Sequence, residues 1–196
     1  QKDDITMTQK IDLPALLDTN DIVAVDTCAI LSDGFIKLFK ESAKAVFRLN
    51  KPLILHGSVV NELVRISRTA EHPKCNIAQE ALLILKVFEH YKIFKYWGNP
   101  KDFRLADQQF LEYVIELMTD NNIAIITLDK KLTSDILMQN MINSYHGHII
   151  KVFGLSDSGK LFDCSNLQNN EGISKKSNNS LIYTKSVESY KKLFNL

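Results

Sequence analysis

Short runs of β-branched and aliphatic residues alternate along this chain with longer segments of helical apolar spacing. Strands are expected at 22–25, 53–57, 93–97 and 123–127, and a strand pair is expected around the turn at 156–159. Each of the first four runs is followed by a segment whose apolar residues recur at helical spacing. This alternation predicts an α/β fold with a central, mostly parallel sheet of about four to five strands flanked by helices.

The regular pattern occupies the middle of the chain and sets the expected domain boundaries. A single α/β domain is predicted over residues 20–155, with an N-terminal extension at 1–19. Residues 156–196 are expected to hold a hairpin, a linker rich in Asn, Ser and Lys, and a terminal helix at 186–196. Local signals also give helix starts: Ser32 or Asp33 is the expected N-cap after the first strand, and Ser58 after the second.

Net charge, cysteine spacing and the length of apolar runs limit the class of protein but do not identify a binding partner. The 196 residues carry a formal net charge of +1, from 24 basic and 23 acidic side chains, so any nucleic-acid contact must come from local basic clusters. The three cysteines are far apart and form no CxxC pair, which fits a reducing, cytoplasmic location. No apolar run reaches the ~18 residues of a membrane span, so no membrane association is expected.

Four carboxylates fall at strand ends or in early helical turns. Asp26 follows the first strand, Glu62 lies just after the second, Asp107 is near the start of its helix, and Asp129 follows the strand at 123–127. In parallel α/β folds the ligand site lies outside the carboxyl ends of the strands, so these side chains are expected to converge. Clustered carboxylates repel one another unless a divalent cation offsets their charge, and Mg²⁺ or Mn²⁺ prefers oxygen ligands. Each residue taken alone could instead cap a helix or complement its dipole.

Four sequence segments resemble the motifs of the PIN-domain family. VAVDTCAIL resembles the first motif, SVVNELVRI the second, ADQQFLEYVIEL the third, and IAIITLDKKL the fourth and most specific. In order and spacing they cover roughly residues 22–153. The larger Gln108, Gln109 and Phe110 after the third acidic residue make the chain more similar to longer PIN proteins than to compact VapC-type toxins.

The resemblance implies a Rossmann-like PIN fold and endonucleolytic, Mg²⁺- or Mn²⁺-dependent cleavage of single-stranded RNA. By motif position, Asp26, Glu62, Asp107 and Asp129 would be the metal ligands and catalytic acids, and Thr127 would orient the site. The implied partners are an RNA substrate and an inhibitory or scaffolding protein, and the family makes a homodimer the expected assembly.

Basic residues near these carboxylates are candidates for holding backbone phosphates. They are Arg65, Arg68, Arg104, Lys130 and Lys131. Tyr96 and Trp97 could stack an unpaired base but are more typical of strand core. Cys28, beside the first acidic residue, is expected to be a small buried filler.

Two other functions fit parts of the pattern. A catalytically silent PIN-like scaffold that binds RNA or protein would need none of the acidic residues, although all four are present. A phosphate-transfer α/β domain with an aspartyl nucleophile also uses carboxylates and a metal ion at the ends of its strands. However, the segment Asp26-Thr27-Cys28 lacks the second Asp of the DxDx[TV] motif.

Overall fold

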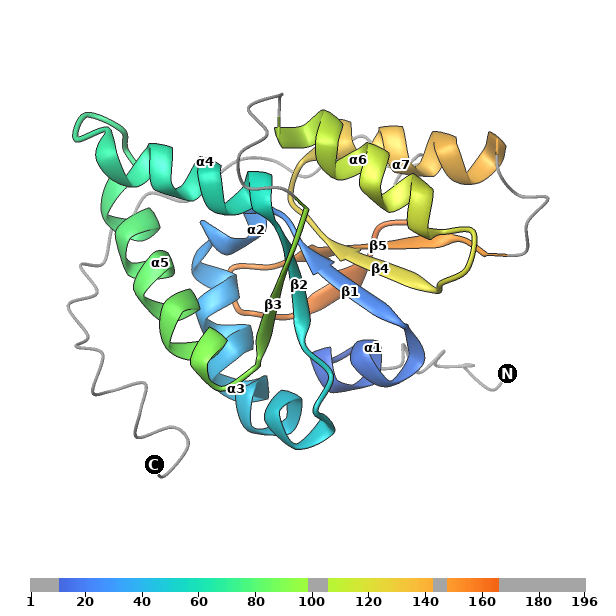
Figure 1. Cartoon of the computed structure of the whole chain (residues 1–196), viewed down its shortest axis with the longest axis horizontal. Coiled ribbons are helices and arrows are strands. Elements are labelled where there is room, and N and C mark those ends of the chain that lie inside the picture. Colours follow the sequence, from blue (N-terminus) through green and yellow to red (C-terminus); the bar gives the residue numbers. More distant parts are fainter. Residues whose placement is uncertain (1–10, 99–105, 143–147, 166–196) are drawn as a thin grey trace, which may run out of the picture.

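A computed structural model of the chain confirms the α/β class (Figure 1). It describes residues 11–98, 106–142 and 148–165, without the side chains of 106–108. The strands are β1 (Ile22–Val25), β2 (Leu53–His56), β3 (Phe94–Trp97), β4 (Ile123–Ile126), β5 (Ile150–Leu155) and β6 (Leu161–Asp163). The helices are α1 (Leu13–Thr19), α2 (Thr27–Ile30), α3 (Asp33–Leu49), α4 (Gly57–Arg68), α5 (Cys75–His90), α6 (Ala106–Leu117) and α7 (Lys130–Ile142).

The six strands form one sheet in the order β3-β2-β1-β4-β5-β6. All neighbouring pairs are parallel except β5 and β6, which form the antiparallel hairpin expected around the turn at 156–159. The chain runs from β1 outward through β2 to β3, and then returns to the other side of β1 as β4. This reversal creates a switch point between β1 and β4, the place where open α/β sheets bind their ligands.

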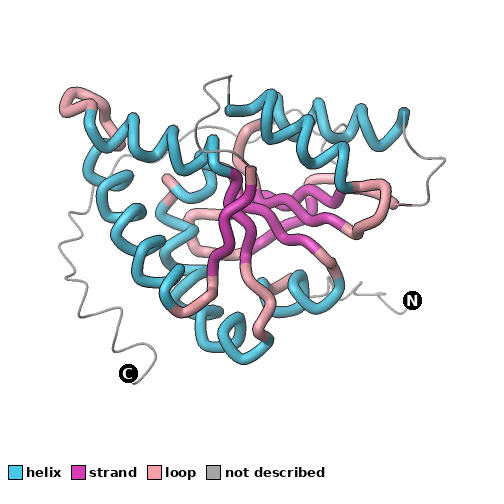
Figure 2. Tube along the Cα trace, in the orientation of Figure 1, coloured by secondary structure: helices cyan, strands magenta, loops and turns pink. Residues whose placement is uncertain are grey.

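Helices cover both faces of the sheet (Figure 2). α1, α3 and α5 lie on one face and α6 and α7 on the other, while α4 starts at the end of β2 and runs outward from the sheet, packed against α5 (Figure 1). Because both faces are covered, the inner strands are continuously apolar. All four residues of β4 are buried, as expected for a parallel strand with helices on both sides.

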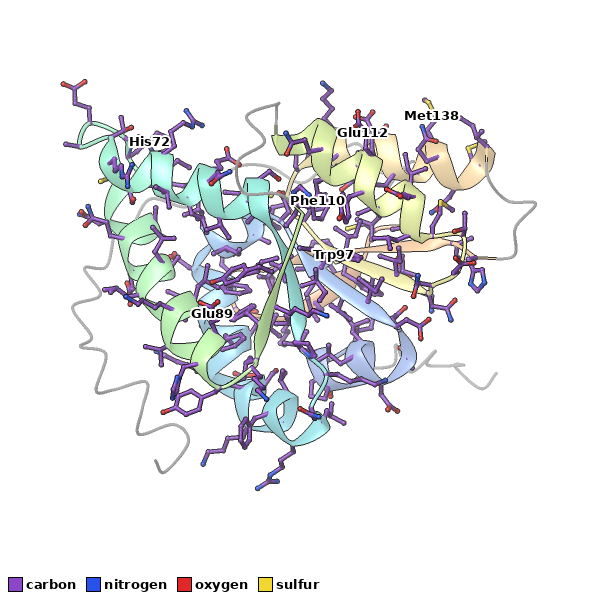
Figure 3. The ribbon with its side chains drawn as sticks, in the orientation of Figure 1. His72, Glu89, Trp97, Phe110, Glu112 and Met138 are labelled. Carbon is purple, nitrogen blue, oxygen red and sulfur yellow. The ribbon has the colours of Figure 1, made fainter. Side chains whose placement is uncertain are left out.

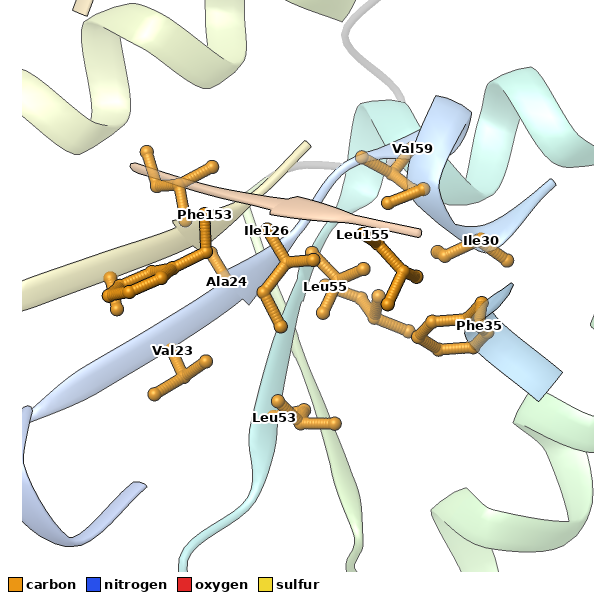
Figure 4. Packing of buried hydrophobic residues seen from close by; sticks show 14 of the residues in the cluster. Val23, Ala24, Ile30, Phe35, Leu53, Leu55, Val59, Ile126, Phe153 and Leu155 are labelled. Atoms are coloured by element: carbon orange, nitrogen blue, oxygen red, sulfur yellow. The ribbon is translucent and has the colours of Figure 1, made fainter. Parts of the chain in front are cut away.

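The buried core joins residues from nearly every element (Figure 4). Leu55, Ile126 and Leu155 pack beside Phe35 of α3, and Phe39 stacks on Phe94 with ring centroids 5.2 Å apart. No helix within the described ranges is both long and apolar enough to cross a bilayer.

Some local details differ from the sequence expectation. The helix after β2 begins at Gly57 and its N-cap is His56, whose side chain accepts from the Ser58 amide, so the prediction of Ser58 as N-cap is wrong. The core also extends past residues 20–155, since Leu13 of α1 is 0% exposed and Leu161 of β6 is 7% exposed. Ser32 does cap α3 as predicted. The helix predicted at 186–196 lies outside the described residues.

Candidate functional site

The candidate site lies where β1 and β4 end. Their pairing runs from Ile22 with Ile123 to Val25 with Ile126. It continues one residue further, because the Asp26 amide donates to the Ile126 carbonyl at 3.0 Å. On the other side of β4, the Thr127 amide donates to the Phe153 carbonyl of β5, also at 3.0 Å. The sheet ladder therefore fixes the backbones of Asp26 and Thr127 in adjacent positions, although 100 residues separate them in sequence.

Asp26 is a buried carboxylate with defined partners for both oxygens. It is 7% exposed and is the N-cap of α2, where Oδ1 accepts from the Thr27 amide at 2.7 Å. Oδ2 accepts from the Thr127 hydroxyl at 2.9 Å and from the Cys28 thiol at 2.7 Å. Burying a carboxylate costs free energy unless hydrogen bonds or a cation compensate it, and here three donors point at the group.

Thr127 connects the Asp26 carboxylate to the backbone amide of Asp129. Its side chain is 1% exposed, and its hydroxyl donates to Asp26 while accepting from the Asp129 amide at 3.0 Å. The Asp129 carboxylate is the N-terminal cap of α7: Oδ1 accepts from the amides of Lys131 at 2.7 Å and Leu132 at 3.0 Å. Asp129 thus serves the helix cap with one oxygen, and Oδ2 accepts no hydrogen bond from the part of the chain that the structure describes.

Cys28 is more than a buried filler. It is half-buried, and its sulfur lies 3.3 Å from the Thr127 hydroxyl and accepts from the Leu128 amide at 3.1 Å, in addition to donating to Asp26. Burial, and then the charge and hydrogen bond of Asp26, raise the pKa of the Cys28 thiol to about 12. The thiol therefore stays protonated at neutral pH and acts as a hydrogen-bond donor, not as a nucleophile.

Glu62 lies on α4, which packs against α2 and α6. Its side chain is 29% exposed and forms an ion pair with Arg65 at 3.6 Å between Oε1 and Nη2. Arg65 is itself 74% exposed, so this i,i+3 pair contributes little to stability. Arg68, Lys130 and Lys131 are also exposed. Lys130 and Lys131 begin α7, soon after the end of β4, whereas Arg68 is the last residue of α4.

Asp107 is the second residue of α6, which packs against α4 and α7. Its side chain lies outside the described part of the structure, as does the whole of Arg104. Within the described residues, no group of three or more His, Cys, Asp or Glu side chains is close enough to hold a metal ion. The structure thus joins Asp26 to Thr127 and Asp129, and it does not bring Glu62 into a ready-made three-carboxylate cluster with them.

Aromatic residues line the adjacent end of the sheet, at β2 and β3. The His56 ring is 3% exposed and lies 5.1 Å from the Tyr113 ring and 6.3 Å from the Phe110 ring, between centroids. Trp97 meets Tyr113 edge-on at 5.2 Å. Figure 3 shows Phe110 below α6 and Trp97 at the end of β3. Gly98 follows with φ +77°, and a Cβ there would overlap the His56 ring.

Sequence reasoning missed His56. The signal is a polar residue between a buried strand and a glycine; His56 is the last residue of β2, inside the strand expected at 53–57, but its capping of α4 is not predicted. Its Nδ1 accepts from the Ser58 amide at 3.2 Å and lies 2.6 Å from the Ser58 hydroxyl, so this nitrogen is an acceptor. The predicted role of Trp97 as strand core fits its half-buried position, whereas Tyr96 is 37% exposed.

Two buried polar groups near the site have no hydrogen-bond partner among the described residues. They are the Thr27 hydroxyl and both amide atoms of Gln109, whose side chains are 4% and 3% exposed. Gln109 shares a helix face with Tyr113, four residues on. An unpaired buried donor or acceptor costs about 1–3 kcal/mol, so replacing the Gln109 amide by an apolar group of similar size is expected to stabilise α6.

Comparisons with known proteins name no family. No protein-family model matches the chain, and no curated protein matches it significantly. One solved structure with a similar course is a domain of a functionally unknown protein from Methanocaldococcus jannaschii. It is 20% identical, with a TM-score of 0.41, over 82% of this chain and 98% of that one.

Proposed function

We propose that this protein is an endoribonuclease that cleaves single-stranded RNA with the help of Mg²⁺ or Mn²⁺ bound at the end of β1 and β4. The observation that carries the proposal is the buried Asp26 carboxylate, hydrogen-bonded to Thr127 at the switch point of a parallel sheet. The four motif-like segments provide the second support, because Asp26 and Asp129 follow β1 and β4, and the helices that carry Glu62 and Asp107, α4 and α6, pack against each other.

The donor chemistry fits such an ion. Mg²⁺ commonly keeps several waters and takes one or two protein carboxylates together with substrate phosphates, so it does not need a preformed cage of three or four side chains. Asp26 and Asp129 are the two carboxylates proposed to hold it; the Thr127 hydroxyl joins the Asp26 carboxylate to the Asp129 backbone amide. Glu62 and Asp107 are proposed as further ligands, directly or through water.

The bound ion and the chain's own residues would have different roles in the reaction. The bound ion would supply positive charge to the phosphate oxygens and acidify a water for attack. Thr127 holds Asp26 Oδ2 in place by its hydrogen bond, which fixes the direction of that carboxylate. Arg65, Arg68, Lys130 and Lys131 are proposed to bind backbone phosphates, and Arg104 is assigned the same role from sequence alone.

Cleavage of a mixed RNA and single-stranded DNA panel with Mn²⁺ tests the proposal directly. Wild type should cut RNA, and Asp26→Asn should lose at least about 100-fold of the rate, because the amide removes the charge that binds the ion. Asp21→Asn is a matched control, since Asp21 is an exposed aspartate just before β1, at the opposite end of that strand. Equal rates for wild type and Asp26→Asn would rule out catalysis at this site.

A non-catalytic scaffold that binds RNA or protein is the second candidate. Two observations favour it: Glu62 is paired with Arg65, and no three-ligand group forms among the described residues. RNA binding that is equal with EDTA and with Mn²⁺, together with no cleavage by wild type, would select the scaffold.

A further inference from the structure

We propose that Cys28 is a positioning residue that fastens the segment after β4 to the Asp26 carboxylate. Its effect on cleavage rests on the proposed nuclease function, whereas the contact itself does not. Cys28 and Leu128 belong to two segments that meet only in the folded chain.

The sulfur of Cys28 has a partner on each side. It donates its proton to Asp26 Oδ2 at 2.7 Å, within its own segment, and accepts from the Leu128 amide at 3.1 Å, across the switch point. A hydrophobic filler of similar size would pack equally well but would leave the Leu128 amide without this acceptor. The hydrogen bond from the Leu128 amide therefore distinguishes a positioning role of Cys28 from a role in packing alone.

The sulfur also completes a closed set of contacts around Asp26 Oδ2. Thr127 donates to the same oxygen at 2.9 Å, and the Thr127 hydroxyl lies 3.3 Å from the sulfur. Two donors from opposite segments thus fix one carboxylate oxygen, and the Leu128 amide fixes the chain between Thr127 and Asp129. Asp26 and Asp129 are held in register as a result. Groups that orient a metal ligand in this way typically change metal affinity about 10–100-fold when removed.

Amide hydrogen exchange in the metal-free protein tests the contact without any assumption about activity. Cys28→Ala should raise the exchange rate of the Leu128 amide at least about tenfold, because the acceptor is lost. Cys28→Ser should stay within about threefold of wild type, since a hydroxyl can both donate and accept. Cys75→Ala is the matched control. It removes the thiol of α5 that donates to the backbone carbonyl of Ser67 in α4, and this contact does not involve Asp26 or Leu128.

Mn²⁺ binding measured by calorimetry without RNA adds the functional readout. Cys28→Ala should weaken binding about 10–100-fold, Cys28→Ser should restore most of it, and Cys75→Ala should leave it unchanged. If wild type binds no Mn²⁺, the nuclease proposal fails while the exchange result still decides the role of Cys28.

Unchanged Leu128 exchange in Cys28→Ala would overturn the proposal and make Cys28 a packing residue. If Cys28→Ala does not fold, the infrared S–H stretch of the wild-type protein tests the contact instead. The variants Cys75→Ala and Cys164→Ala identify the bands of the other two thiols, so that the remaining band belongs to Cys28. A thiol bonded to a carboxylate absorbs at clearly lower wavenumber than one bonded to a carbonyl, and coincident bands would also exclude the contact.

Discussion

The end of the sheet has two halves that are built from different interactions. At β1 and β4, Asp26, Cys28 and Thr127 are joined by directional hydrogen bonds. At β2 and β3, His56, Tyr113 and Trp97 meet through ring faces and edges. Hydrogen bonds fix atoms to within a few tenths of an ångström, whereas aromatic packing mainly excludes water. The polar half therefore positions chemical groups, and the aromatic half anchors α6 beside them.

The largest expected loss of stability comes from disrupting the aromatic packing at β2 and β3. Phe110→Ala should lower the free energy of unfolding by about 3–5 kcal/mol, because a ring 3% exposed leaves a cavity under α6. Urea denaturation measures it. Phe162→Ala is the control, since that ring is 40% exposed and should cost much less. A loss below 1 kcal/mol for Phe110→Ala would mean that the aromatic half does not anchor α6.

The next largest loss of stability is expected from removing a hydrogen-bonding group at β1 and β4. Thr127→Val keeps the shape but removes the donor to Asp26 and the acceptor of the Asp129 amide, which should cost about 2 kcal/mol of stability. Thr133→Val is the matched control, because the Thr133 hydroxyl donates only to a carbonyl four residues earlier, in its own helix turn. Thermal unfolding of the two variants compares them, and equal losses would contradict a special role for the Thr127 hydroxyl.

The pH dependence of stability tests whether the folded state holds the proton of the Cys28 thiol. The raised pKa favours the protonated thiol in the folded state, so its contribution is complete below the ordinary value of 9.0 and is lost as pH rises from there towards about 12. At about pH 10 wild type should have lost about 1 kcal/mol more than Cys28→Ala, relative to pH 7. Parallel pH profiles would show that the folded state does not hold the proton.

Gln109 borders the aromatic half and should respond in the opposite direction. Gln109→Met has similar volume and removes two buried polar atoms without partners among the described residues, so stability should rise by about 0.5–1 kcal/mol. Urea denaturation gives the value. A decrease of more than 1 kcal/mol would show that the amide is hydrogen-bonded in solution.

The smallest stability effect is expected at Arg65, on the rim of the site. Arg65→Ala should change stability by less than about 0.5 kcal/mol, because the side chain is 74% exposed. If it contacts one phosphate, the salt dependence of RNA binding should fall by about one unit of slope. Arg48→Ala, an exposed arginine in the last turn of α3, should leave the slope unchanged.

The fold could largely be predicted because its signals are local. The continuous apolar run of β4 and the capping Ser32 are readable from neighbouring residues alone, and the structure has both. The contacts of α1 were not readable, because seven residues do not indicate which face of a sheet they cover. The use of His56 as both strand end and helix cap was not readable either, because Ser, Thr, Asp and Asn are the usual capping residues and Ser58 lies two positions later.

The sequence by itself determined the order of the elements, the parallel sheet and the placement of Asp26 and Asp129 at strand ends, because apolar periodicity is set by which residues must leave water. Only the tertiary structure decided the contacts of Asp26 with Thr127 and Cys28, the pairing of Glu62 with Arg65, and the burial of Gln109. These depend on side chains from different segments meeting at hydrogen-bond distance, and chain spacing does not encode that distance.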